Sequence, residues 1–240
     1  MSLHDPAVVR AEYSSEDGLK ARASVYQGLA GPDARDTALA AVAEIRPRSV
    51  LEVGCGWGAF AARIRDELGA SVVAVDISPR MVELARTRGI DAQQGDVCAL
   101  PFQDGSFDCV VANWMLYHAS DIDLAVSELA RVLRPGGRLV AATNSSHHLE
   151  ELWALVDRDK AAEVRHFFSE DGTSRLEPHF TSVKQRDVVS SIEFDADGVR
   201  GYVGSSIAHK HLVDNVPDFE EPLVATRRCT IFVADKGRDS

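Results

Sequence analysis

The stretch that decides the fold runs from Ser49 to Phe60 and reads S-V-L-E-V-G-C-G-W-G-A-F. Its first half is a short apolar run, which is typical of a strand buried in a parallel sheet. Gly54, Gly56 and Gly58 then interrupt the strand, and the residues that follow have helical character. Because glycine permits a tight turn and the close approach of a ligand, this succession predicts the first half of a nucleotide-binding βαβ unit.

Two classes of cofactor are compatible with this glycine spacing. Gly54, Gly56 and Ala59 satisfy the loose dinucleotide pattern G-x-G-x-x-G/A, so an NAD-dependent oxidoreductase is one hypothesis. Glu52 favours another, because a carboxylate two residues before the first glycine repels a pyrophosphate and suits a cationic ligand. With Gly58 it gives the pattern E-x-G-x-G-x-G. The stretch resembles the first motif of class I S-adenosylmethionine-dependent methyltransferases, whose cofactor carries an ammonium and a sulfonium but no phosphate.

The bulk composition bounds the kind of protein. With 240 residues, 45% hydrophobic and 26% charged, the chain fits one soluble globular domain. Its net charge is −11 and it has no run of five basic residues, so no nucleic-acid partner is expected. The cysteines form no C-x-x-C pair, the N-terminus lacks the apolar segment of a signal peptide, and no apolar run reaches the ~18 residues of a membrane span. We therefore expect a cytoplasmic protein without a membrane span.

Acidic residues near the ends of the next two predicted strands add to the cofactor site. Asp76 lies 22 residues after Gly54, close to the ~20-residue offset at which an acidic side chain meets ribose hydroxyls. The resemblance implies that Asp76 binds the ribose and that Ile77 packs on the adenine. It also implies that Asp96 accepts a hydrogen bond from the adenine amino group, while the backbone N–H of Val97 meets a ring nitrogen. Without the resemblance, Asp96 would be read as an ordinary turn residue.

Four further residues complete the predicted cofactor site. In the resembled family the end of the fourth strand faces the sulfonium, and the Asn113 carbonyl could receive the cofactor ammonium. Tyr13 and the L-x-x-R that ends at Arg22 resemble an N-terminal segment that closes over the methionine end of the cofactor. Since a guanidinium forks well onto a carboxylate, Arg22 could pair with that of the cofactor, and a solvated helix arginine is the equal alternative. Met81, at the start of the next predicted helix, is the fourth.

Candidates for catalysis are fewer, because methyl transfer can proceed without a dedicated base. If one exists, His147, Tyr117 and His118 are the first to test, although packing or capping is the favoured role of His118. The histidines at 147, 148 and 179 are a conceivable metal cluster. They lack an i, i+4 helical spacing, and adjacent histidines cannot easily point at one site. No metal site is therefore predicted.

The predicted fold is α/β. Strands alternate with helices over residues 49–145, which indicates a parallel sheet with helices on both faces. The resemblance implies a Rossmann-like doubly wound sheet of seven strands, mostly parallel with an antiparallel last strand, and a helical substrate lid. We expect a single methyltransferase domain over residues 1–240, with a helical cover (1–48), a cofactor-binding core (49–145), a lid insert (146–180) and the final strands (181–240).

The leading hypothesis for function is transfer of a methyl group from S-adenosylmethionine to a small organic acceptor by in-line displacement. Positioning alone can supply much of the rate, since an aligned pair gains up to ~7–11 kcal/mol of the barrier. The NAD hypothesis leaves Glu52, Gly58 and Asp96 unexplained, and a cofactor-binding protein without chemistry is the third possibility. The chain resembles the ubiquinone- and menaquinone-biosynthesis methyltransferases and many enzymes of secondary metabolism. The sequence leaves the acceptor, the methylated atom and the oligomeric state open.

Overall fold

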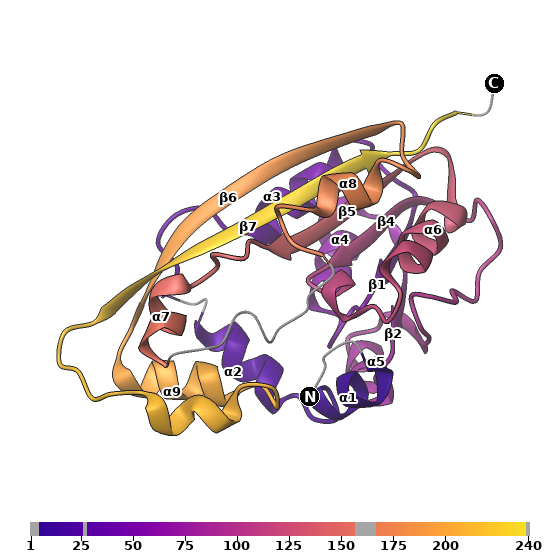
Figure 1. The fold of residues 1–240 in the computed structure, drawn as a ribbon. Helices are drawn as coiled ribbons and strands as arrows, with labels where there is room; N and C mark the ends of the chain where they lie inside the picture. The colour runs from indigo at the N-terminus through magenta and orange to yellow at the C-terminus, as the bar shows by residue number, and fades with distance from the viewer. Residues whose placement is uncertain (1–4, 26–27, 157–166, 239–240) are drawn as a thin grey trace.

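The structure, a computed structural model, describes residues 5–25, 28–156 and 167–238. Its centre is a seven-stranded sheet with the order β3-β2-β1-β4-β5-β7-β6 (Figure 1). Strands β1 to β5 pair in parallel, and β7 pairs antiparallel with both β5 and β6. The predicted mostly parallel sheet with an antiparallel last strand is confirmed. The strands are β1 (Ser49–Val53), β2 (Ser71–Asp76), β3 (Asp91–Gln94), β4 (Phe107–Asn113), β5 (Leu133–Asn144), β6 (Ser182–Phe194) and β7 (Leu223–Asp235).

Helices cover both faces of this sheet, as a doubly wound fold requires. One apolar core lies under α3 (Ala34–Ala43), α4 (Ala59–Leu68) and α5 (Pro79–Thr87). A second lies on the opposite face, under α6 (Ile122–Val132) and α8 (Gly172–Leu176). The buried strands β1 and β4 supply side chains to both cores in alternation, which is why they read as near-continuous apolar runs in the sequence.

Strand β5 contains the segment Pro135-Gly136-Gly137 near its start. Before this segment, Leu133 pairs with Phe107. The next paired residues are Cys109 and Arg138, so the register shifts between the two pairs. The glycine-rich segment therefore forms an irregularity inside one long strand.

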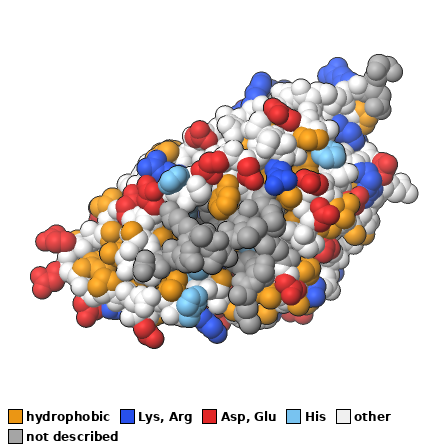
Figure 2. Space-filling view, viewed as in Figure 1, with side chains coloured by type: hydrophobic (Ala, Val, Ile, Leu, Met, Phe, Trp, Pro, Cys, Tyr) orange, Lys and Arg blue, Asp and Glu red, His pale blue; other side chains and the backbone are white. Residues whose placement is uncertain are grey.

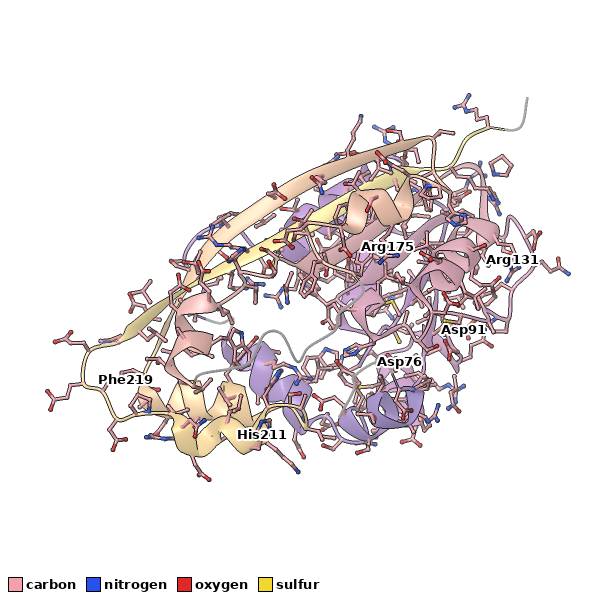
Figure 3. The ribbon with its side chains drawn as sticks, in the orientation of Figure 1. Asp76, Asp91, Arg131, Arg175, His211 and Phe219 are labelled. Atoms are coloured by element: carbon pink, nitrogen blue, oxygen red, sulfur yellow. The ribbon has the colours of Figure 1, made fainter. Side chains whose placement is uncertain are left out.

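A third apolar cluster extends the molecule beyond the sheet. It joins α7 (Glu150–Leu155), α9 (Ala196–Gly204) and the 3₁₀ helix η4 (Lys210–Asn215) to the ends of β6 and β7. Phe219 and His211 lie in this part of the molecule, far from Asp91 at the other end (Figure 3). Helices α1 (Pro6–Glu12) and α2 (Asp17–Val25) lie next to it, with α2 packed on α9 (Figure 1).

The segments predicted as cover and lid contain helices that lie in different parts of the structure. Only α1 and α2 of the expected cover lie away from the sheet, since α3 packs on β5 and β7. In the expected lid insert, α8 packs into the main core, and residues 157–166 lie outside the described residues. None of the described helices has the length and apolar character needed to cross a membrane. Acidic and basic side chains are interspersed on the face shown in Figure 2, unlike the basic stripe of a nucleic-acid-binding surface.

Candidate cofactor and acceptor site

A cavity of about 640 Å³ lies at the carboxyl ends of β1, β2 and β4, the position at which open α/β sheets bind their ligands. Residues from α1, α2 and the segment after α9 also line it. The structure brings twelve of the predicted site residues to this cavity: Tyr13, Arg22, Glu52, Gly54, Gly56, Asp76, Ile77, Asp96, Val97, Asn113, Tyr117 and His118. Met81 and His147 are the two predicted residues that it does not bring there.

The three glycines of the loop have separate tasks. Gly54 and Gly58 have left-handed backbones, and a Cβ on either would lie within 3 Å of the side chain of Met115 or Ala85, respectively. Gly56 (φ +52°) turns its N–H toward Asp76, whose Oδ2 accepts it at 2.8 Å. The loop therefore combines close packing with a backbone donor at the cavity wall.

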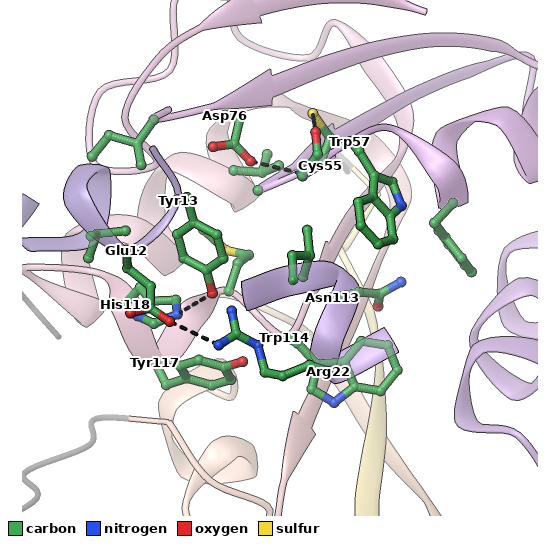
Figure 4. Close-up of a pocket in the computed structure, with 18 of the residues that line it drawn as sticks. Glu12, Tyr13, Arg22, Cys55, Trp57, Asp76, Asn113, Trp114, Tyr117 and His118 are labelled. Atoms are coloured by element: carbon green, nitrogen blue, oxygen red, sulfur yellow. Dashed lines mark hydrogen bonds and ion pairs between the residues drawn. The ribbon is translucent and has the colours of Figure 1, made fainter. Parts of the chain in front are cut away.

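Asp76 is held in place from both sides. Its Oδ1 accepts from the backbone N–H of Ser78 at 2.9 Å, and its Oδ2 accepts from Gly56. Burial raises the pKa of this carboxyl, while these backbone donors oppose the change. Each carboxylate oxygen still has a lone pair to offer. Asp76 lines the cavity at the end of β2 (Figures 3 and 4), and its ribose role stays a prediction.

Glu52 is a buried carboxyl with an unused oxygen. Its residue is 3% exposed, and Oε2 has no hydrogen-bond partner among the described residues. Burial and the neighbouring Asp76 raise its pKa to about 8, while a hydrogen bond from the Ala61 backbone at the start of α4 opposes them. A buried carboxyl in this state gains most from a cationic ligand, because the cation stabilises its ionised form.

Arg22 of α2 also lines the cavity. It lies where α1 and the segment after α9 meet α2. Its Nη1 donates to Glu12 Oε1 and to the Ser205 carbonyl, each at 2.9 Å, and its guanidinium lies over the Tyr13 ring at 5.7 Å (Figure 4). Its Nη2 is buried without a hydrogen-bond partner among the described residues. Arg22 is therefore no solvated helix arginine, and it has a donor left for an anionic group.

The residues predicted to contact the adenine line the same cavity. Asp96 and Val97 line the cavity beyond β3, and Ile77 lines it beyond β2. Asp96 Oδ1 accepts from the Cys98 backbone at 2.9 Å, which orients the carboxylate. Met81, in the first turn of α5, is fully buried and does not line the cavity. Helix α5 begins at Pro79, so its first turn directs this side chain into the protein.

Of the three catalytic candidates, two belong to an aromatic group at the cavity. Tyr13 Oη and His118 Nε2 are 3.1 Å apart, and the Tyr117 ring meets that of His118 at 4.6 Å between centroids (Figure 4). His147 lies at the surface instead, with its side chain 61% exposed and Nδ1 2.9 Å from Glu150 Oε2. His148 is buried and contacts the backbone of Arg228. No group of three potential metal ligands is found in the part of the chain that the structure describes.

Comparison with known proteins identifies the fold and the motif. Residues 51–141 match the family described as a methyltransferase domain. The chain belongs to the class I S-adenosylmethionine-dependent methyltransferases. The malonyl-[acyl-carrier protein] O-methyltransferase of Erwinia billingiae is 33% identical over 168 residues, which is 68% of this chain and 66% of that protein. The demethylmenaquinone methyltransferase of Thermus thermophilus is 38% identical over 104 residues, or 40% of this chain and 47% of that protein.

Solved structures agree on the fold. The phosphoethanolamine N-methyltransferase 2 of Haemonchus contortus, in complex with S-adenosyl-L-methionine, superposes with a TM-score of 0.64 at 18% identity over 99% of this chain and 60% of that one. This chain matches between 30% and 66% of the lengths of its first three curated relatives. The residues of this methyltransferase fit the cofactor, because the unused oxygen of Glu52 suits its ammonium and the unused donor of Arg22 suits its carboxylate.

The methyltransferase cavity is also lined by residues that belong to no motif. We call the part of the cavity that they line the acceptor chamber; they are Trp114, Trp153, Tyr202, His209 and Arg227. Trp114 follows β4 with a left-handed backbone (φ +52°), which is strained for a bulky residue. Its backbone N–H donates to the Ala142 carbonyl at 2.8 Å, and its indole Nε1 donates to Asn144 Oδ1 at 3.0 Å. These bonds fix the indole in the cavity wall beside Asn113, whose amide atoms are buried without partners among the described residues.

The other residues of this chamber come from α7 and from the last third of the chain. Trp153 of α7, Tyr202 of α9 and His209 line it, with the Trp153 ring 4.8 Å from that of His209. Arg227 of β7 is also part of the wall and is 4% exposed. Trp153 was a conceivable pocket residue from its sequence, with a plain lid core as the equal alternative. Sequence reasoning missed Tyr202, His209 and Arg227 as site residues, because they follow no motif. The one signal was the basic pair at 227–228 at the start of an apolar strand.

Proposed function

We propose that this protein transfers a methyl group from S-adenosylmethionine to a small organic acceptor. The observation that carries the proposal is a buried carboxyl and a buried guanidinium, Glu52 and Arg22, in one cavity with Asp76. Glu52 Oε2 and Arg22 Nη2 have no hydrogen-bond partner among the described residues. That set matches an amino-acid group joined to a nucleoside. It does not match NAD, whose pyrophosphate would have to lie against Glu52.

The role of the chain in the reaction is mainly to position two molecules. When bound, S-adenosylmethionine supplies an electrophilic methyl group on a sulfonium, which the nucleophilic atom of the acceptor takes by in-line displacement. Asp76 and Asp96 orient the nucleoside, while Glu52 and Arg22 hold the amino-acid end. Trp114 and Asn113, at the end of β4, line the cavity that the cofactor and the acceptor would share. A rigid wall of this kind lowers the barrier by restricting approach.

If the acceptor needs a proton removed, Tyr117 and His118 are the residues that we propose for it. Both line the cavity, and the hydrogen bond between His118 and Tyr13 offers a path for a proton toward α1. We do not propose His147 for this role, because its side chain is 61% exposed and it does not line the cavity. A pH profile of turnover for H118Q distinguishes a base from a packing residue, since only a base shifts the profile.

We also propose that α1, α2 and the segment after α9 act together as the cover of the site. Glu12 links them, because Oε1 accepts from Arg22 and Oε2 accepts from the Ile207 N–H at 2.7 Å. A Cβ on Gly18 would lie 2.4 Å from the Ser205 carbonyl oxygen, so the helices approach closely here. We propose a cytoplasmic location, because free thiols such as those of the four cysteines persist in a reducing compartment.

Formation of S-adenosylhomocysteine tests the proposal. Purified protein is incubated with S-adenosylmethionine and a panel of acceptors that includes a malonyl thioester, a demethylated quinol and phosphoethanolamine, named for the proteins to which this chain is similar. We expect S-adenosylhomocysteine to form only when an accepted compound is present. Binding of S-adenosylmethionine without turnover on any small molecule would support a cofactor-binding protein instead.

A further inference from the structure

The carboxylate of Glu12 is buried in the proposed cover, and both of its oxygens accept hydrogen bonds. Its side chain is 3% exposed. Oε1 accepts from Arg22 Nη1 at 2.9 Å (Figure 4), and Oε2 accepts from the Ile207 N–H at 2.7 Å. Glu12 ends α1, Arg22 lies in α2, and Ile207 lies in the segment after α9. One carboxylate therefore joins three parts of the chain that are distant in sequence.

The guanidinium of Arg22 is held through one of its two terminal nitrogens. Nη1 donates to Glu12 and to the Ser205 carbonyl, which uses both hydrogens of that nitrogen. Nη2 is buried without a hydrogen-bond partner among the described residues, in a side chain that lines the cavity. Because a guanidinium is planar and rigid, the two bonds at Nη1 also set the direction of Nη2. Conversely, an anionic group bound at Nη2 restrains the bonds at Nη1.

The segment 205–209 carries part of the acceptor chamber. Its backbone meets α1 and α2 at two points, the Ser205 carbonyl and the Ile207 N–H. Ser205 and Ser206 line the cavity, and His209 lies in the acceptor chamber. Within the segment, the His209 N–H donates to the Ser206 carbonyl at 3.1 Å. A shift of residues 205–207 therefore also moves the residue that faces the acceptor.

We infer that Glu12 is a positioning residue that transmits binding of the cofactor carboxylate at Arg22 to the acceptor chamber. The inference rests on the proposed function, since it assigns a coupling within the same site. A carboxylate on Nη2 restrains the guanidinium, and the guanidinium restrains Glu12 and the Ser205 carbonyl. Glu12 in turn restrains the Ile207 N–H. The acceptor chamber is thus completed when the amino-acid end of the cofactor is bound, and by linkage a bound acceptor tightens the cofactor by the same factor.

The test compares S-adenosylmethionine with its decarboxylated analogue, which keeps the ammonium and the nucleoside but lacks the carboxylate. Hydrogen exchange of residues 205–209 is followed by mass spectrometry on the full chain, free and saturated with either ligand. Calorimetry gives the dissociation constants of both ligands. The proteins are the wild type, E12Q, E12D and E16Q.

The variants separate the two bonds of Glu12 from its charge. Glutamine has one acceptor oxygen, so E12Q cannot keep both bonds, and E12D keeps the charge on a side chain that is one methylene shorter. Glu16 is the matched control, because it directly precedes α2, pairs with Lys20 and Arg80, and does not line the cavity. E12D decides the outcome if E12Q does not fold.

In the wild type, S-adenosylmethionine should slow exchange of the segment about 5-fold or more beyond the decarboxylated ligand, the low end of coupling between two sites. E12Q and E12D should lose this difference. E12Q should also bind S-adenosylmethionine about 10-fold more weakly, while its affinity for the decarboxylated ligand equals that of the wild type. E16Q should match the wild type in both measurements.

Equal slowing by the two ligands in the wild type, or an undiminished difference in the Glu12 variants, overturns the inference and leaves the proposed function standing. Equal weakening of both ligands in E12Q also overturns it, because that result indicates a general structural role. Failure of the wild type to bind S-adenosylmethionine overturns the proposed function and the inference with it.

Discussion

Replacing Glu52 with glutamine is predicted to have opposite effects on stability and on cofactor binding. The carboxyl is buried, and burial together with Asp76 raises its pKa to about 8 from an ordinary value of 4.5. Between these two pH values the unfolded chain has lost this proton while the ligand-free folded protein retains it. The free energy of unfolding therefore falls as pH rises through this window. Glutamine has the same shape and no proton to lose, so E52Q lacks this dependence.

The size of the effect follows from the shift in pKa. Each pH unit in the window costs the wild type about 1.4 kcal/mol, which amounts to about 3 kcal/mol between pH 5 and pH 7.5. The affinity for the cofactor instead rises with pH, because the ammonium of the cofactor stabilises the ionised carboxylate of Glu52. The wild type then binds S-adenosylhomocysteine more tightly as pH rises toward 8, with release of a proton. E52Q binds it about 10- to 100-fold more weakly at pH 8, the range of a charge-assisted bond.

Urea unfolding from pH 5 to pH 8 and calorimetric titration with S-adenosylhomocysteine measure both effects. E67Q is the control, since Glu67 is exposed on α4 and pairs with Arg63 at the surface. The advantage of E52Q over the wild type should grow with pH, and E67Q should follow the wild type. Parallel pH profiles of stability for E52Q and the wild type, or equal affinities for S-adenosylhomocysteine at pH 8, would refute the role of this carboxyl.

Three further predictions concern the loop and the site. D76N should weaken S-adenosylhomocysteine binding about 10-fold or more, whereas D91N, at the exposed start of β3, should not. Equal affinities of D76N and the wild type in calorimetry would contradict the ribose role. G58A should lower the urea-unfolding free energy more than G69A by about 1–3 kcal/mol, because both backbones are left-handed but only position 58 lacks space for a Cβ; equal losses would contradict this. H147A should keep wild-type turnover, and a tenfold loss would return this residue to the site.

The cofactor half of the site could be predicted from the sequence because it is local. Glu52 ends β1 next to the turn of Gly54 and Gly56, and Asp76 and Asp96 follow at the ends of the next strands. Parallel pairing brings these residues to one edge of the sheet. The register of β1 with β2 then places Asp76 within reach of the Gly56 N–H. The role of Asp96 needed the family resemblance as well, since an aspartate there is otherwise an ordinary turn residue.

The acceptor half could not be predicted, because long-range packing places it. Arg227 reaches the cavity through a strand that enters the sheet antiparallel between β5 and β6. Tyr202 and His209 reach it through an apolar cluster that joins α7, α9 and η4, and no periodic pattern relates these segments to the glycine loop. The left-handed backbone of Trp114 has no residue-level signal, since glycine or asparagine is the usual residue there. The position of His147 also could not be predicted from a motif. Its side chain pairs with Glu150 at the surface.

The most direct test of the central claim is a thermal-shift titration of the purified protein with S-adenosylmethionine, S-adenosylhomocysteine, NAD and NADP. A ligand at 100 times its Kd adds about 2.7 kcal/mol to the free energy of unfolding, which raises the Tm of a chain of this size by roughly 5–11 °C. A cavity built around Glu52, Arg22 and Asp76 predicts this rise with the two sulfur nucleosides and none with NAD or NADP. A rise with NAD or NADP alone would contradict the account and show that Glu52 tolerates a pyrophosphate.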